Sequence, residues 1–190
     1  MTKGNAKAVL KNELFDWLEI IVCAIIIVVL IFTFVFRVVT IIGQSMENTV
    51  FEGEKLIISN WFYTPKAGDV VVISRNIDNT PGDSASGGPI IKRIIATENQ
   101  VVNIDFSTGV VYVDGVALDE PYTKTPTNLK YDIEFPVTVK PGCVFCLGDN
   151  RNESLDSRSS AIGDNGMIDT RYILGRVVFR VFPFNRMGGV

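Results

Sequence analysis

The sequence predicts a mostly β protein: one apolar helix near the N-terminus, followed by an antiparallel β domain of sandwich or barrel type. Three observations predict this fold: a long uncharged apolar run, a series of short β-branched runs behind it, and turn residues between those runs. Short runs of this kind, bounded by Gly, Pro, Asn and Asp, are typical of strands joined by turns. A chain of 190 residues can hold one such domain together with one helix.

The apolar run covers residues 20–36 and contains no charge. Extended by Trp17 and Leu18, a helix with a rise of about 1.5 Å per residue approaches the roughly 30 Å of a bilayer's hydrocarbon core. We therefore expect a transmembrane helix over residues 17–37, behind an N-terminal segment of residues 1–16. A cleavable signal peptide is the main alternative, but the run exceeds the usual apolar length of about 7–15 residues and no small-x-small site follows. A buried core helix is disfavoured because the run is apolar on every face.

Charged residues beside the apolar run predict its orientation. Lys3, Lys7 and Lys11 precede the run, whereas only Arg37 lies just after it. The positive-inside rule then puts the N-terminal segment in the cytoplasm and residues 38–190 outside the cytoplasmic membrane. The lipid bilayer is thus an expected partner. A net charge of −3 gives no indication of a nucleic-acid partner.

Eight β-branched runs follow the apolar segment. They cover residues 56–59, 70–74, 90–96, 101–104, 110–113, 135–139, 144–147 and 173–182. Asp114-Gly115, between two apolar segments, is a strong signal for a β-hairpin. Two longer stretches predict loops: a surface insert over residues 77–89, rich in Asn, Asp, Gly and Ser, and a polar segment over residues 149–169. The second is too long for a plain connection, which favours a functional loop.

Histidine is absent from the sequence. Its absence excludes Ser-His-Asp and Cys-His catalysis and removes the commonest transition-metal ligand. A hydrolase of this composition must take its general base from Lys, Asp, Glu or Tyr. Cys143 and Cys146 would stand about 10 Å apart on an extended strand, which is too far for a disulfide, and zinc would be short of ligands. We therefore expect no metal and no cofactor.

Two segments carry residues suited to nucleophilic catalysis. In residues 43–50, Ser45 follows a turn that can expose its hydroxyl and free backbone N–H groups for an oxyanion hole; an ordinary loop is the alternative. In residues 89–96, strand alternation puts Lys92 and Arg93 on opposite faces, each among isoleucines. Burial lowers the pKa of a lysine and makes a neutral base available, whereas arginine stays protonated. Lys92 is the candidate base, and an edge-strand lysine with its amine in water is the alternative.

A third segment, residues 148–158, contains several acceptors and donors and two arginines. Such a loop can become rigid through charge-assisted hydrogen bonds, for example from Asp156 to Arg158 or Arg151. The alternatives are a solvated polar loop and a calcium loop, although the acidic spacing does not match the EF-hand pattern.

Together, and in this order behind one membrane helix, the three segments resemble those of the type I signal peptidases. The family's serine box, Ser-Met-x-Pro-Thr-Leu, is similar to residues 45–50, and its lysine box, Lys-Arg before two hydrophobic residues, is matched by residues 92–95. Its late box, Gly-Asp-Asn-Arg-x-x-Ser-x-Asp-Ser-Arg, is matched in full by residues 148–158. The ending over residues 182–186 is similar to the C-terminal strand of Gram-positive members.

The resemblance implies a role for residues of each box. Ser45 would be the nucleophile, with its backbone N–H in the oxyanion hole. Lys92 would be the general base, and Ser154 would hydrogen-bond this lysine and orient it. Asp156 and Arg158 would form a supporting salt bridge.

The chain also departs from the family pattern. Asn48 replaces the usual proline of the serine box and Val50 the usual leucine. Gly43 stands where some relatives carry a serine that assists the oxyanion hole, and residues 96–100 replace a frequent Gly-Leu-Pro-Gly-Asp. The resemblance further implies that Met46 lies near the substrate pocket.

The function implied by the resemblance is that of a membrane-anchored serine endopeptidase. It would remove signal peptides from exported preproteins at the outer face of the cytoplasmic membrane, cutting after small residues at −1 and −3. One alternative is a specialised Ser/Lys protease that matures a narrow set of substrates such as pilin-like proteins. Another is an inactive membrane-anchored β domain that binds partners. Soluble self-cleaving repressors share the chemistry but lack the anchor, and sortases are excluded because they need histidine.

Overall fold

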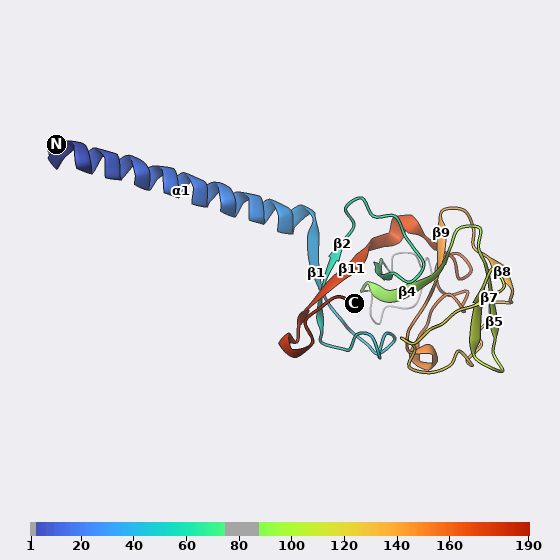
Figure 1. Cartoon of the computed structure of the whole chain (residues 1–190). Helices are drawn as coiled ribbons and strands as arrows, with labels where there is room; N and C mark the ends of the chain where they lie inside the picture. The colour runs from blue at the N-terminus through green and yellow to red at the C-terminus, as the bar shows by residue number, and fades with distance from the viewer. Residues whose placement is uncertain (1–2, 75–87) are drawn as a thin grey trace. The chain divides into compact units, whose positions relative to one another are not determined.

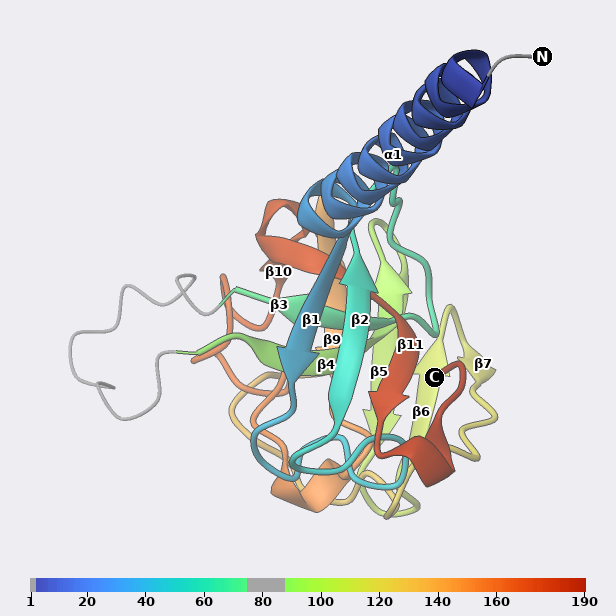
Figure 2. The ribbon, with the colours of Figure 1, turned by 90° about the vertical axis from the view of Figure 1, so that its left-hand side faces the viewer.

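The structure is a computed structural model that describes residues 3–74 and 88–190. The chain divides into two compact units, Met1–Arg37 and Val38–Val190, which Figures 1 and 2 show from two sides. The surface insert predicted over residues 77–89 lies outside the described residues except for its last two.

The first unit consists of helix α1 (Lys3–Phe34). Its portion Glu13–Thr33 has the length and composition needed to cross a membrane, with a mean hydropathy of 2.8, and none of its most apolar stretch is buried. A core helix of a soluble domain would instead be mostly buried. The helix ends at Phe34, before the expected residue 37, and strand β1 (Phe36–Thr40) begins two residues later.

The second unit contains two β-sheets in its described part. The larger sheet has seven strands in the order β1, β2 (Lys55–Ser59), β11 (Ile173–Phe182), β3 (Val70–Ile73), β4 (Ile90–Thr97), β9 (Cys143–Leu147) and β10 (Ile168–Asp169). The smaller sheet has four strands in the order β7 (Val116–Ala117), β6 (Val110–Val113), β5 (Val101–Asp105) and β8 (Val137–Thr138). Short 3-10 helices are η1 (Arg151–Glu153), η2 (Thr170–Tyr172) and η3 (Phe184–Arg186).

The two sheets share a hydrophobic core, which explains why they form one unit. Ile95 of β4 and Leu147 of β9 are buried together with Val102 of β5 and Val111 of β6. Each such side chain contributes about 1.5–3 kcal/mol when it is removed from water. A second cluster packs Met46 among residues of β2, β3 and β11. The core thereby holds the segment that follows Ser45 against the larger sheet.

The predicted β fold is confirmed. All strand pairs with a described register are antiparallel. The hairpin at Asp114-Gly115 connects β6 and β7, and both turn residues have the positive φ that such a turn requires. The run predicted over residues 135–139 is reduced to β8, since Pro136 has no N–H to give to a ladder.

Candidate active site

Strand β4 places Lys92 in the interior of the larger sheet. Lys92 pairs with Val71 of β3, and the next residue, Arg93, pairs with Leu147 of β9. Only 3% of Lys92 is exposed. The alternative of an edge-strand lysine with its amine in water is therefore wrong for this chain.

Ser45 lies in a turn that is anchored on both sides. On its N-terminal side, Gly43 has a φ of +88°, a conformation that favours glycine. On its C-terminal side, the amides of Thr49 and Val50 both donate to the carbonyl oxygen of Met46, at 3.1 and 3.0 Å. The buried side chains of Met46 and Val50 fix the turn in the core.

The turn and the strand bring Ser45 and Lys92 together. The Nζ of Lys92 donates a hydrogen bond to the Oγ of Ser45 at 2.8 Å. This separation lies within the range of about 2.6–3.2 Å that proton transfer between a nucleophile and its base requires. The geometry thus permits a lysine amine, once neutral, to accept the proton of the serine hydroxyl.

The loop of residues 148–158 is buried and self-bonded. Asp156 and Arg158 form an ion pair with an Oδ1–Nε distance of 2.8 Å, and both side chains are fully buried. The other carboxylate oxygen of Asp156 accepts from Nη2 of Arg158 at 2.9 Å and from the amide of Gly148 at 3.1 Å. The solvated and calcium-loop alternatives do not fit this arrangement. Arg151, the other expected partner of Asp156, pairs instead with Glu120 at 2.6 Å.

The same loop holds the serine turn directly. The amide of Asn150 donates to the carbonyl oxygen of Ser45 at 3.0 Å, and its Nδ2 donates to the carbonyl oxygen of Gln44 at 3.1 Å. A Cβ on Gly148 would collide with the carbonyl oxygen of Ser45 and with the hydroxyl of Ser154. The missing side chain at Gly148 is therefore what allows this loop to approach the serine turn so closely.

Ser154 is 1% exposed, and its hydroxyl has no hydrogen-bond partner within the described part of the chain. A buried hydroxyl without a partner is costly, so such groups commonly have a functional reason. That Ser154 hydrogen-bonds and orients Lys92 stays a prediction.

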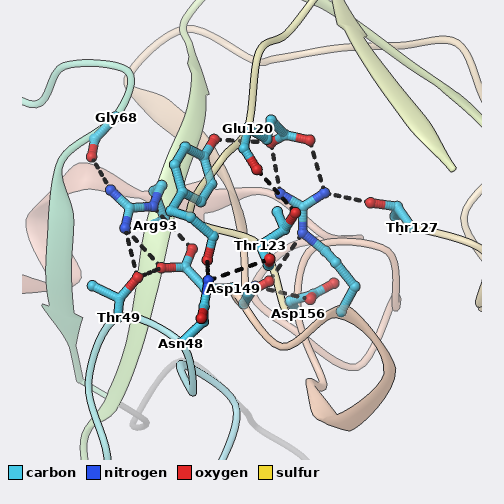
Figure 3. A network of polar contacts seen from close by, with 12 residues as sticks. Asn48, Thr49, Gly68, Arg93, Glu120, Thr123, Thr127, Asp149 and Asp156 are labelled. Atoms are coloured by element: carbon cyan, nitrogen blue, oxygen red, sulfur yellow. Dashed lines mark hydrogen bonds and ion pairs between the residues drawn. The ribbon is translucent and has the colours of Figure 1, made fainter. Parts of the chain in front are cut away.

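A second buried ion pair joins the three boxes, as Figure 3 shows. Arg93 donates to Asp149 through Nε at 2.9 Å and through Nη2 at 2.7 Å. The hydroxyl of Thr49 also donates to Asp149, while Nη1 of Arg93 donates to the carbonyl oxygen of Gly68 at 2.8 Å. Sequence reasoning missed this pair. The available signal was Arg93 itself, because an arginine among core isoleucines needs an anion.

A cavity of about 240 Å³ opens beside Ser45. Its lining includes Ile41, Met46, Val72 and Ile91, so the wall next to the hydroxyl is largely apolar. Met46 is buried and forms part of this wall. That Met46 lies near bound substrate stays a prediction.

Neither Cys143 nor Cys146 is in a disulfide. Burial raises the pKa of the Cys146 thiol, although the neighbouring Lys92 acts in the opposite direction. Cys146 is therefore a neutral thiol at physiological pH. Within residues 3–74 and 88–190, no group of three His, Cys, Asp or Glu side chains is arranged to hold a metal ion.

Known proteins resemble this chain over most of its length. The family model described as signal peptidase, peptidase S26 matches residues 14–182. A signal peptidase I of Bacillus licheniformis is 31% identical over 187 residues, which cover 93% of each chain. A probable signal peptidase I-2 of Synechocystis is 35% identical over 182 residues, which cover 90% of this chain and 76% of that one. A crystal structure of a signal peptidase I from Enterococcus faecalis V583 covers 60% of this chain and 97% of that chain, with 24% identity and a TM-score of 0.44.

The family model and the two sequence relatives define the protein first as a hydrolase of the serine endopeptidase class. The chain belongs to the signal peptidase family, peptidase S26. This family is associated with membranes and processes signal peptides, in agreement with the apolar helix α1.

Proposed function

We propose that the protein is a type I signal peptidase that cleaves preproteins with a Ser45–Lys92 dyad. The observation that carries this proposal is the 2.8 Å hydrogen bond between Nζ of Lys92 and Oγ of Ser45. Lys92 is the suitable base because its amine can lose a proton, whereas the guanidinium of Arg93 stays protonated and is paired with Asp149.

The proposed reaction passes through an acyl-enzyme. Neutral Lys92 takes the proton of the Ser45 hydroxyl while Oγ attacks the scissile carbonyl carbon. The backbone N–H of Ser45 donates to the oxyanion that forms. The Lys92 ammonium then gives its proton to the leaving amine as the peptide bond breaks. Water attacks the ester carbonyl carbon while neutral Lys92 accepts a proton from it. The tetrahedral species then expels Oγ of Ser45, which takes this proton back from the Lys92 ammonium, and the new carboxyl end is released.

Ser154, Asp156 and Arg158 would support the dyad without touching the substrate. The buried Asp156–Arg158 pair holds the loop through the carbonyl oxygens of Arg151 and Ser154, at 2.6 and 3.3 Å from Nη2 of Arg158. A rigid loop keeps the Ser154 hydroxyl in place near the turn of Ser45. We propose that this hydroxyl turns toward Lys92 during the reaction and orients its amine.

The cavity beside Ser45 supports a preference for small side chains at the −1 and −3 positions of the substrate. Most of the side chains in its wall are branched aliphatic ones and Met46, and none of the described residues that line it is charged. A small apolar residue can enter such a space without leaving an unpaired polar group. Met46 would be the side chain that limits the depth of the pocket.

The membrane arrangement is also part of the proposal. The portion Glu13–Thr33 of helix α1 would cross the cytoplasmic membrane once, with Lys3, Lys7 and Lys11 ahead of it in the cytoplasm and the β unit outside. The active site would then face exported preproteins, which are held at the membrane by their own apolar signal segments. Anchoring enzyme and substrate to one surface raises their effective concentration.

The experiment is cleavage of a preprotein by the full-length protein in detergent micelles or vesicles. Ser45→Ala removes the nucleophile and is expected to lower kcat by at least about 1000-fold. Ser107→Ala is the matched control, because Ser107 lies in an exposed turn where it bonds to Asp105. Cleavage by Ser45→Ala at a rate near that of the control would overturn the proposal and favour a binding domain.

A further inference from the structure

A connecting segment outside the three boxes contacts all of them. This segment, residues 120–124, follows β7 and is named the strap. Its composition predicts nothing more than a loop. Its contacts indicate a role in the proposed active site, and this inference therefore rests on the proposed function.

The strap holds the serine box through Asn48. The Nδ2 of Asn48 donates to the carbonyl oxygens of Tyr122 and Thr123, at 3.0 and 3.3 Å. A salt bridge of 2.6 Å between Lys124 and Glu47 lies beside these hydrogen bonds. Two consecutive residues of the serine turn, Glu47 and Asn48, are thus bonded to the strap.

The backbone at Asn48 explains why this position is not proline here. Asn48 has a φ of +97°, a region that asparagine tolerates better than most residues. Proline is locked near −65° and cannot adopt it. The usual family residue is therefore incompatible with this turn, and the asparagine amide replaces its rigidity with hydrogen bonds to the strap.

The strap holds the lysine box through Tyr122. The guanidinium carbon of Arg93 lies 4.0 Å from the centre of the Tyr122 ring, a distance at which a cation is attracted to an aromatic face. The hydroxyl of Tyr122 donates to Glu120 at 2.9 Å. Burial raises the pKa of this hydroxyl, so it stays protonated and can donate.

The strap holds the late box at two points. The carboxylate of Glu120 accepts hydrogen bonds from Nη2 and Nη1 of Arg151, at 2.6 and 3.0 Å, and the two groups form a bidentate ion pair. The backbone amide of Lys124 donates to the carbonyl oxygen of Asp149 at 2.9 Å. Figure 3 shows Glu120, Asn48 and Asp149 in this one network.

We propose that the strap is a positioning element of the active site and that Tyr122 and Asn48 are its positioning residues. Tyr122 joins two boxes by itself: its ring lies on Arg93, the residue next to Lys92, and its carbonyl oxygen binds Asn48, three residues after Ser45. Loss of either contact lets the serine turn move relative to β4. A displacement of about 1 Å is enough to reduce a rate about 100-fold.

The first test changes Asn48 in the full-length protein. Asn48→Asp keeps the size of the side chain but removes its donors and sets a carboxylate against two carbonyl oxygens. We expect kcat to fall about 10- to 100-fold, with KM changed less than about threefold, because Oγ of Ser45 shifts relative to Lys92 while the buried Met46 keeps its place in the wall of the pocket. Asn48→Gly keeps the backbone conformation without the amide and should show a similar loss, and Asn48→Pro a larger one. Asn128→Ala is the matched control, since its Nδ2 also donates to a backbone carbonyl oxygen, that of Phe106 at 2.9 Å.

The second test changes Tyr122. Tyr122→Leu removes the ring from Arg93 and is expected to lower kcat at least about 10-fold. Tyr122→Phe keeps the ring and should restore most of this loss, although the bond to Glu120 is gone. Tyr112→Leu, in β6 of the smaller sheet, is the matched control.

A readout independent of activity is hydrogen exchange of the backbone amides in residues 44–50, measured by mass spectrometry. Exchange there should be faster in Asn48→Asp and Tyr122→Leu, and unchanged in both control variants. Wild-type kcat and exchange in these two variants would overturn the positioning role, and so would a rise of KM alone. An active Ser45→Ala variant would overturn the proposed dyad, whereas the exchange result would still decide on the strap.

Discussion

The two faces of β4 hold neighbouring cations in different surroundings. On one face, Arg93 lies among the carboxylate of Asp149, the carbonyl oxygen of Gly68 and the ring of Tyr122. On the other, the Lys92 amine donates to the hydroxyl of Ser45, and both Lys92 and the carboxylate of Asp156 act electrostatically on the thiol of Cys146. The difference follows from chemistry: a guanidinium never gives up its proton and must be neutralised by an anion, whereas an amine that acts as a base must be able to lose its charge.

The largest expected effect is a loss of activity when Lys92 is replaced by arginine, the residue type found on the opposite face of β4. Lys92→Arg keeps a cation next to Ser45 but cannot accept a proton, so kcat should fall by at least about 1000-fold. Preprotein cleavage measures this loss, and Lys55→Arg on the exposed face of β2 is the control. If Lys92→Arg kept substantial activity, the general-base role would be wrong.

The next effect is a loss of stability when the anion that pairs with Arg93 is removed. Asp149→Asn leaves the buried guanidinium of Arg93 without its anion, which costs about 3–5 kcal/mol of unfolding free energy. Asp169→Asn removes an exposed ion pair with Arg171 and should cost at most about 1 kcal/mol. Urea unfolding of both variants measures the difference. Equal stabilities would show that Asp149 is not needed to neutralise Arg93.

The smallest expected effect is the pH dependence of kcat/KM, which tests whether Lys92 acts as a neutral base. If neutral Lys92 is the base, kcat/KM rises by at most about tenfold per pH unit up to the pKa of its amine and is level above it. The rise is the direction that a neutral base requires, because only the unprotonated amine can accept the proton of the Ser45 hydroxyl. Burial raises the pKa values of Cys146 and Tyr122, so neither group accounts for such a rise. A flat profile between about pH 5 and 10 contradicts the assignment.

Local patterns predicted the parts of this molecule that depend on local chemistry. The β-branched runs predicted the strands because the residues that decide burial along a strand are neighbours in the sequence. Sequence patterns also indicated that Lys92 could be buried, since isoleucines share its face of the strand, and its exposure of 3% confirms the burial. Its role as the base stays a prediction. The buried pair of Asp156 and Arg158 could be predicted for a similar reason, as only one residue separates them.

Contacts between distant segments could not be predicted in this way. Arg93 and Asp149 are 56 residues apart, and Asn48 and Tyr122 are 74 apart. No periodicity relates such positions, and the sequence of the strap, Glu-Pro-Tyr-Thr-Lys, does not differ from that of an ordinary loop. The start of β1 at Phe36 was missed for a related reason, because pairing with β2 overrides the apolar pattern that continues from the helix.

The hydrogen bonds from Asn150 to the serine turn have a consequence for the order in which the enzyme is made. Gln44 and Asn150 are 106 residues apart, so synthesis delivers the nucleophile long before the segment that fixes it. A nascent chain halted after Lys92 but before the late box contains both members of the dyad but lacks the two hydrogen bonds by which Asn150 fixes the serine turn. We expect such incomplete chains to be inert, so that a protease made at the export site acts only after its own synthesis is nearly finished.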